Sequence, residues 1–175
     1  NNWIEKLEKG TIWELTGGEP LIQQKQLLKL VEAFVTKYNF SPKIDFETNA
    51  TLMPSPRWKQ EFEATFTTSP KLTTNGDPEA KTYKPEVLKY HREINSGFKF
   101  VINDPAEDIK EIWSKYVEDD NGINVSRDRI WFMPCAGSRE EHIANAEAVV
   151  EYAKSMHVHF SPRLHLLVWD KALKV

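Results

Sequence analysis

Strand-like and helix-like segments alternate along nearly the whole 175-residue chain, which predicts an α/β fold built on a mostly parallel sheet. Short apolar segments recur, and most are followed by apolar residues at helical spacing. Proline and capping residues stand where several helices should begin. The length and a 40% hydrophobic composition suit a single domain with a real core.

The first elements are expected to be a short helix at Asn2 to Glu8 and a buried strand over Thr11 to Leu15. Pro20 fits the first turn of a helix over roughly 20–38, because the missing N–H costs nothing there. That helix has one apolar stripe, formed by Leu27, Leu28, Val31, Phe34 and Val35.

Two strands should follow, one ending at Glu47 and one over roughly 61–67, where apolar and polar residues alternate. The link between them contains Pro54 and Pro56 and leaves little room for a helix. Residues 68–84 form a long polar stretch, and a loop of that length is usually functional or mobile.

In the second half, Pro85 should open a helix, and Gly97 to Asn103 reads as a strand. The apolar stripe of that helix includes Val87, Leu88, His91 and Ile94. Asp104 and Pro105 should start the next helix, which ends at the acidic turn 118–122. Its apolar face comprises Ile109, Ile112, Trp113, Tyr116 and Val117.

The last predicted elements are a strand over Arg129 to Met133, a long helix and a final apolar run from Val158 to Trp169. Ser138 and Glu141 form a capping box for the helix. Its buried residues are expected to be Ile143, Ala146, Val150 and Ala153. Because the final run contains Pro162, it is expected to be an edge strand or a wrapped tail.

Composition narrows the class of function. The net charge of −3 and an isoelectric point near 6.0 argue against a nucleic-acid-binding surface. No apolar run has the length of a membrane span, and no signal-peptide pattern opens the chain. One cysteine excludes an intramolecular disulfide. We therefore expect a cytoplasmic protein that acts on a small molecule, without nucleic-acid or membrane partners.

The most informative segment, Thr16-Gly17-Gly18-Glu19-Pro20, stands where a strand gives way to a helix. Two glycines there let the backbone approach a ligand that a Cβ would exclude, and ligands bind at the carboxyl ends of parallel strands. The same letters also form plain tight turns.

Further motifs follow at successive strand ends, namely Glu47-Thr48-Asn49, Ser69-Pro70-Lys71 and Ser161-Pro162-Arg163-Leu164-His165. In this order, the set resembles the radical S-adenosylmethionine (SAM) superfamily, and most closely the 7-carboxy-7-deazaguanine synthase family. The resemblance covers the chain from Thr11 onward. It implies an incomplete (β/α)6-type radical SAM barrel rather than a doubly wound sheet, as one domain over 1–175.

The resemblance has one departure. The superfamily holds a 4Fe–4S cluster with three cysteines near its amino terminus, whereas this chain contains only Cys135. We therefore expect that the first strand and the cluster loop, with the Mg²⁺ ligand, lie upstream of Asn1, so no metal ligand is assigned in this chain. A degenerate homologue without the chemistry is the alternative.

Cofactor and substrate contacts carry over from the resemblance. The SAM-binding set would be Gly17, Gly18, Glu19, Ser69, Pro70, Lys71, Met133, Pro134, Cys135 and Ala136. The substrate-binding set would be Thr16, Arg163, His165 and Val175, and no catalytic residue is assigned. On an extended segment, Arg163 and His165 would share one face.

Each assignment has an ordinary structural alternative. Glu19 could be a first-turn acid favoured by the helix dipole, and Ser69 and Lys71 a turn serine and a solvated lysine. Glu47 to Asn49 could simply hold a strand end together. Cys135 fits a small buried hydrophobe better than a nucleophile. With His157 and His159, the segment that carries Arg163 and His165 gives only a weak metal-site pattern.

The resemblance also implies a reaction. A radical formed from SAM, with the cluster and Mg²⁺ as further cofactors, would take hydrogen from 6-carboxytetrahydropterin. The ring would contract to 7-carboxy-7-deazaguanine with loss of ammonia, a step of queuosine-type biosynthesis. A homodimer is expected from the family. Alternatives are another radical SAM enzyme, such as a glycyl-radical activase, and a cluster-less SAM-binding module.

Overall fold

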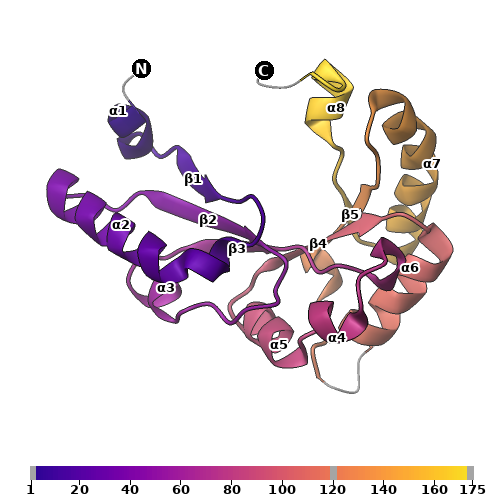
Figure 1. Cartoon of the computed structure of the whole chain (residues 1–175). Coiled ribbons are helices and arrows are strands. Elements are labelled where there is room, and N and C mark those ends of the chain that lie inside the picture. The colour runs from indigo at the N-terminus through magenta and orange to yellow at the C-terminus, as the bar shows by residue number, and fades with distance from the viewer. Residues whose placement is uncertain (1–2, 119–121, 173–175) are drawn as a thin grey trace.

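The computed structural model describes residues 3–118 and 122–172, and it contains a six-stranded, all-parallel sheet (Figure 1). Each strand pairs with the next along the chain, in the order β1-β2-β3-β4-β5-β6. The strands are β1 (Ile12–Leu15), β2 (Lys43–Thr48), β3 (Thr65–Thr68), β4 (Gly97–Ile102), β5 (Ile130–Pro134) and β6 (His159–Phe160). The predicted α/β class is confirmed.

Helices and helical turns connect the strands. The α-helices are α1 (Trp3–Glu8), α2 (Gln24–Tyr38), α3 (Arg57–Gln60), α4 (Glu79–Thr82), α5 (Pro85–Glu93), α6 (Pro105–Ile112), α7 (Arg139–Met156) and α8 (Leu164–Trp169). Shorter turns are η1 (Pro20–Gln23), η2 (Thr73–Asn75), the π-helical η3 (Trp113–Val117) and η4 (Arg127–Arg129). Among the described residues, no helix combines the length and apolar character that crossing a bilayer requires.

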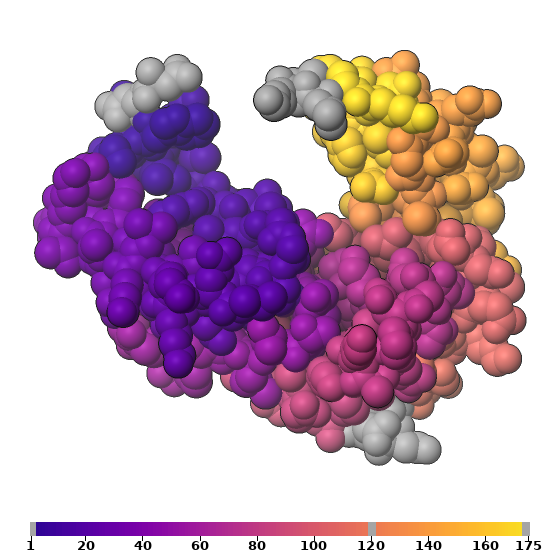
Figure 2. Space-filling view, viewed as in Figure 1, coloured from indigo at the N-terminus to yellow at the C-terminus, as the bar shows by residue number. Residues whose placement is uncertain are grey.

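The strands follow one another in chain order across the sheet. The sheet is open, because within the described residues β1 and β6 each pair on one side only. The helices between the strands lie on its outer side, while α1 and α8 stand apart above the two ends of the sheet (Figure 1). In the space-filling view the molecule is a crescent, hollowed between its N-terminal and C-terminal arms (Figure 2). The order of strands differs from that of a doubly wound sheet, in which the order reverses at the centre.

The two faces of the sheet differ sharply in chemistry. The covered face carries large apolar side chains that form the core with the helices, namely Phe46, Phe66, Phe98, Phe100, Ile130 and Phe132. The uncovered face carries Asp45, Glu47, Thr65, Thr67 and Lys99. This separation follows from the alternation of side chains along each strand, because register-aligned residues of parallel neighbours share a face.

Two predicted helix starts have the expected caps. The Asp104 side chain accepts hydrogen bonds from the backbone N–H groups of Ala106 and Glu107, at 3.1 and 3.3 Å. Ser138 Oγ accepts from the N–H of Glu141 at 3.2 Å. The carboxylate of Glu141 reaches back one residue further than a capping box requires and accepts from Gly137 N–H at 2.6 Å.

The stripe predicted for the long helix was wrong in part. Ile143 is 60% exposed, whereas its neighbour His142 is 2% exposed and packs inward with Val149 and Ala153. The buried face is therefore rotated by about one residue from the predicted one, because α7 packs against β5, β6 and α8 in a direction that its own sequence does not fix.

Three other boundaries differ from the prediction. The third strand begins at Thr65 rather than near 61, since Glu63 has a φ of 51° and Ala64 N–H bonds back to Trp58 O at 2.9 Å. The polar stretch 68–84 contains η2 and α4 and is not a bare loop. The final apolar run is a two-residue edge strand, as expected, but it continues into helix α8.

The buried His91 generates a prediction about acid stability. Burial lowers the pKa of His91 to about 4, and its Nδ1 lies 3.0 Å from Ser96 Oγ. The unfolded chain keeps an ordinary histidine pKa near 6.5, so the neutral folded form loses stability as pH falls from about 6.5 to about 4, by roughly 3 kcal/mol. Above pH 6.5 the full stability should remain.

Urea unfolding at pH 7.5 and pH 4.5 measures this loss. The variant His91→Gln should be less stable at pH 7.5 and should show a smaller drop between the two pH values than the parent. The matched control His165→Gln removes an exposed imidazole and should retain the parent's pH dependence. Equal drops in the parent and in His91→Gln would contradict the assignment.

Candidate active site

The predicted motif segments lie at one rim of the molecule, formed by the carboxyl ends of the strands. Thr16 to Pro20 follow β1, Asn49 follows β2, and Ser69 to Lys71 follow β3. Because all six strands are parallel and neighbours pair in chain order, these loops necessarily stand next to one another. This rim is where parallel α/β sheets place their ligands.

The carboxylate of Glu19 joins the first two strand ends. It accepts hydrogen bonds from Thr48 Oγ1, at 2.9 and 3.0 Å to its two oxygens, and from Asn49 N–H at 2.8 Å. It also accepts from Leu21 N–H at 3.0 Å, which caps η1. The side chain is thus occupied within the protein, so Gly17 to Glu19 would meet a ligand chiefly through backbone groups.

The two glycines leave that backbone accessible. Gly17 and Gly18 have φ angles of 86° and 56°, which residues other than glycine rarely adopt. A Cβ added at either position would meet nothing within 4 Å among the described residues. The glycines are therefore required by conformation and not by crowding, and the space beside them is open to a ligand. Thr16 is exposed next to this space.

The third strand end is built differently. Ser69 and Pro70 are buried, whereas Lys71 is exposed. Ser69 N–H donates to Thr48 O at 2.7 Å, so the pairing of β3 with β2 continues past the last strand residue. Lys71 is therefore the residue of this motif whose charge is freely presented to solvent at the rim.

The end of β5 is tied on both sides. Met133 and Cys135 are half-buried, while Pro134 and Ala136 are buried. Cys135 N–H donates to Ile102 O at 2.8 Å, and Cys135 O accepts from Asn145 Nδ2 at 2.8 Å. These contacts hold the loop through its backbone, and Cys135 has the half-buried setting of a packing residue.

Arg163 and His165 do not share an extended face, which corrects the prediction. Arg163 precedes α8, and its guanidinium donates to Ala136 O. His165 lies inside α8 and is exposed. The chain turns into the helix directly after Arg163, so the segment is not extended and the shared face expected of a strand is lost. Val175 lies outside the described residues.

Helix α8 is fastened to the start of α7 by Arg139. Its Nε and Nη2 donate to Leu167 O and Val168 O at 2.9 and 3.0 Å, and its N–H donates to Asp170 Oδ1 at 2.7 Å. Arg139 satisfies carbonyls at the end of α8 that would otherwise lack partners. A basic residue at the start of a helix was the only feature of the sequence that could have indicated this contact.

Two further rim features were missed from the sequence. Asp108 is fully buried, and its carboxylate accepts from the N–H groups of Asn103 and Asp104 at 2.7 and 2.9 Å and from Thr74 Oγ1. It joins the β4 end to the segment that follows β3. On the uncovered face, Glu47 forms an ion pair with Lys99. Charged residues at alternate strand positions were the only available signal.

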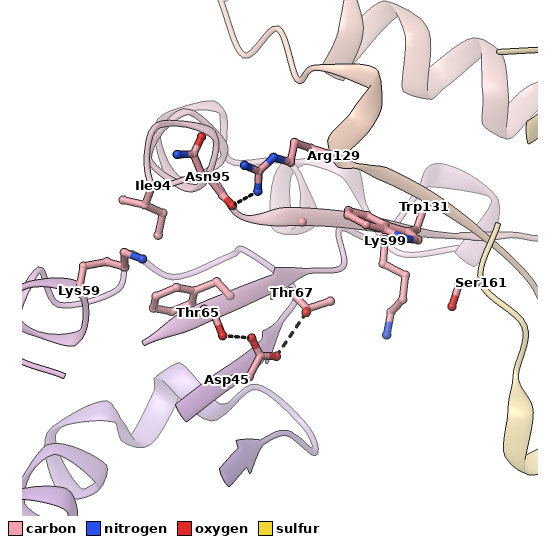
Figure 3. Close-up of a pocket in the computed structure, with 12 residues that line it drawn as sticks. Asp45, Lys59, Thr65, Thr67, Ile94, Asn95, Lys99, Arg129, Trp131 and Ser161 are labelled. Atoms are coloured by element: carbon pink, nitrogen blue, oxygen red, sulfur yellow. Dashed lines mark hydrogen bonds between the residues drawn. The ribbon is translucent and has the colours of Figure 1, made fainter. Parts of the chain in front are cut away.

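A cavity of about 430 Å³ lies beside the amino ends of β3, β4 and β5 and extends onto the uncovered face of the sheet (Figure 3). It is lined by Asp45, Lys59, Thr65, Phe66, Thr67, Ile94, Asn95, Gly97, Lys99, Arg129, Trp131 and Ser161. None of the residues predicted to bind SAM or substrate lines it.

The weak histidine pattern near the carboxyl end does not form a metal site. Within residues 3–118 and 122–172, no group of three or more His, Cys, Asp or Glu side chains could hold a metal ion. His159 instead stacks on Trp131, with ring centroids 4.8 Å apart, and its Nε2 lies 3.1 Å from Asp128 O.

Two curated proteins are similar to most of this chain. One, the 7-carboxy-7-deazaguanine synthase of Pyrobaculum aerophilum, is 28% identical over 158 residues, which cover 90% of this chain and 65% of the relative. The other, the 7-carboxy-7-deazaguanine synthase of Hyperthermus butylicus, is 30% identical over 158 residues, covering 88% and 63% respectively. No family model matches the chain. The chain thus spans a little under two thirds of the length of these relatives.

The Glu19 contacts generate a stability prediction. Glu19→Ala should lower the free energy of unfolding by about 2 kcal/mol, because Thr48 Oγ1 and Asn49 N–H lose a charged acceptor. Glu14→Ala is the matched control, since Glu14 is an exposed acid on β1, the strand that precedes Glu19, and it should cost less than about 0.5 kcal/mol. Urea unfolding measures both, and equal small losses would show that the Glu19 contacts contribute little.

Proposed function

We propose that this chain is part of a 7-carboxy-7-deazaguanine synthase, a radical SAM lyase that converts 6-carboxytetrahydropterin to 7-carboxy-7-deazaguanine with loss of ammonia. The observation that carries the proposal is the meeting of the ordered motifs after β1, β2 and β3 at one rim. Similarity to two proteins of that name supports the choice of reaction. The finer description of the sheet as an incomplete radical SAM barrel belongs to the same proposal.

The rim fits SAM at its methionine end. The open backbone at Gly17 and Gly18 offers carbonyl acceptors for an ammonium group, without side chains in the way. Lys71 offers a solvent-facing cation for the carboxylate, and Ser69 a hydroxyl at the same strand end. Met133 to Ala136 would contribute on the far side of the rim.

The iron–sulfur cluster does not fit the residues of this chain. A 4Fe–4S cluster needs three or four thiolates, and the 175 residues contain one cysteine. Cluster ligands, and any Mg²⁺ ligand associated with them, would have to come from sequence outside these residues. The relatives are longer than the matched region, which leaves room for such a segment.

The residues of this chain would act by binding and positioning. Bound SAM would supply the radical that removes hydrogen from the substrate. Glu19 would keep the glycine backbone at a fixed distance from the β2 end, through Thr48 and Asn49. Thr16, exposed beside the glycines, would donate a hydrogen bond from its hydroxyl to the pterin. The α8 segment held by Arg139 and Arg163 would close one side of the rim.

A cluster-less SAM-binding module is the second candidate, and the single cysteine is the observation that favours it. Both candidates require SAM at the rim, and only the lyase requires turnover. Binding and turnover therefore have to be measured separately.

SAM binding is tested by calorimetry on the chain itself. Gly18→Val should weaken SAM binding at least about tenfold, because a branched side chain enters the open space and strains the backbone at φ 56°. Gly10→Val is the matched control, since Gly10 also has a positive φ (92°) and a Cβ there would meet only the flexible Lys43 side chain, at 3.5 Å. Gly10 precedes β1 and so lies at the end of the strand opposite to the rim glycines. Unchanged SAM affinity in Gly18→Val would place the cofactor elsewhere.

Turnover is tested on the full-length protein, reconstituted with iron and sulfide under anaerobic conditions. It should convert 6-carboxytetrahydropterin to 7-carboxy-7-deazaguanine, with SAM not consumed in proportion to product, as followed by mass spectrometry. Thr16→Val should retain SAM affinity and raise the KM for the pterin, since it deletes a hydroxyl and little volume. SAM binding without any deazapurine product would favour the module over the lyase.

A further inference from the structure

The cavity on the uncovered face lies away from the rim, toward the amino ends of the central strands. Lys59, Asn95 and Arg129 line it from the segments that precede β3, β4 and β5 (Figure 3). Its volume of about 430 Å³ falls within the range of small-molecule sites. Nothing in the proposed lyase reaction uses these residues.

Trp131 gives the cavity an aromatic wall, and Gly97 makes room for it. A Cβ at Gly97 would stand 3.0 Å from the indole Cζ3 of Trp131, tighter than most real Cβ contacts, so the ring would have to shift by a few tenths of an ångström to admit a larger residue. His159 stacks on the indole with an interplanar angle of 21°. An indole fixed in this way on an otherwise polar sheet face is a preformed surface for a flat ring.

The charges around the cavity favour an anion. Its lining contains three cations, Lys59, Lys99 and Arg129, and one acid, Asp45. Arg129 is held by donation from Nη1 to Asn95 O at 2.9 Å, and its Nε lies 3.8 Å from the Asp128 carboxylate. This leaves the Nη2 group of its planar guanidinium available for a carboxylate. Because Lys99 is paired with Glu47 and Arg129 with Asp128, Lys59 is the lining cation without an ion pair among the described residues.

Asp45 supplies a fixed acceptor opposite these cations. The hydroxyl groups of Thr65 and Thr67 each donate to its carboxylate, at 2.5 and 3.3 Å (Figure 3). These bonds orient the carboxylate on the sheet, and its remaining acceptor sites can receive ring N–H or amino groups. The cavity therefore combines a flat apolar wall, cations and an oriented acid.

We propose that this cavity is a second ligand site, which binds a planar heterocyclic carboxylate with its ring against Trp131, its carboxylate toward Arg129 and Lys59, and its N–H groups toward Asp45. The site needs neither SAM nor a cluster. Its occupancy can therefore be measured on the chain alone, and failure to bind would not bear on turnover at the rim.

Pterin-6-carboxylate is a suitable probe, because it is planar, anionic and fluorescent. Titration of the chain with this compound should show saturable binding, and pterin, which lacks the carboxylate, should bind at least about tenfold more weakly. Arg129→Gln should weaken pterin-6-carboxylate binding by about tenfold, and Lys59→Gln by a smaller factor. Arg127→Gln, which removes an equivalent charge two residues away but outside the cavity, should leave the affinity unchanged.

Trp131→Leu should weaken the binding of both pterin-6-carboxylate and pterin, since stacking on the indole does not depend on the carboxylate. Far-UV circular dichroism and urea unfolding of each variant separate loss of the site from loss of the fold. Equal affinity for the two pterins, or equal binding by the parent and Arg129→Gln, would overturn the proposal. Competition by SAM would also overturn it, because the ligand would then occupy the rim.

Discussion

The arrangement of the candidate active site depends on one carboxylate, that of Glu19. Gly17 and Gly18 have no side chains that could anchor the backbone before Glu19. They also follow β1, which pairs only with β2 among the described residues. Glu19 replaces this missing support by bonding to Thr48 and Asn49 on the neighbouring strand end. The backbone is thereby both open to a ligand and fixed in place, a combination that preorganised binding requires.

Other charged side chains around the rim also hold strand ends in place by hydrogen bonds. Asp108 joins the β4 end to the segment after β3, Glu141 holds the loop after β5, and Arg163 ties that loop to the start of α8. Each contact satisfies backbone groups at a strand end or helix start that would otherwise be left without partners. Because most of these bonds link the ends of neighbouring strands, a substitution at one strand end should also shift the backbone at the next.

The uncovered sheet face explains why a second site is possible. A core face must be apolar, whereas this face carries the register partners Asp45 and Thr65 and the ion pair of Glu47 with Lys99. Polar residues on this face stay hydrated or pair with one another. A hydrated cavity can therefore persist there, whereas an apolar core would pack to fill it. The rim and the cavity are thus two regions of one concave surface, separated along the strand direction.

The sequence by itself determined the α/β class, the order of the strands' motifs and most of the helix starts, because alternation, proline positions and capping residues are local signals. It also indicated an open backbone at Gly17 and Gly18, with a plain tight turn as the alternative, whereas their positive φ angles are known only from the structure. Only the tertiary structure decided which face of α7 is buried, that α8 is a helix, and that Glu19 is engaged by Thr48. The Glu19 contact joins segments about 30 residues apart, and the orientation of α7 depends on its packing against β5, β6 and α8, so no local pattern in the chain encodes these outcomes.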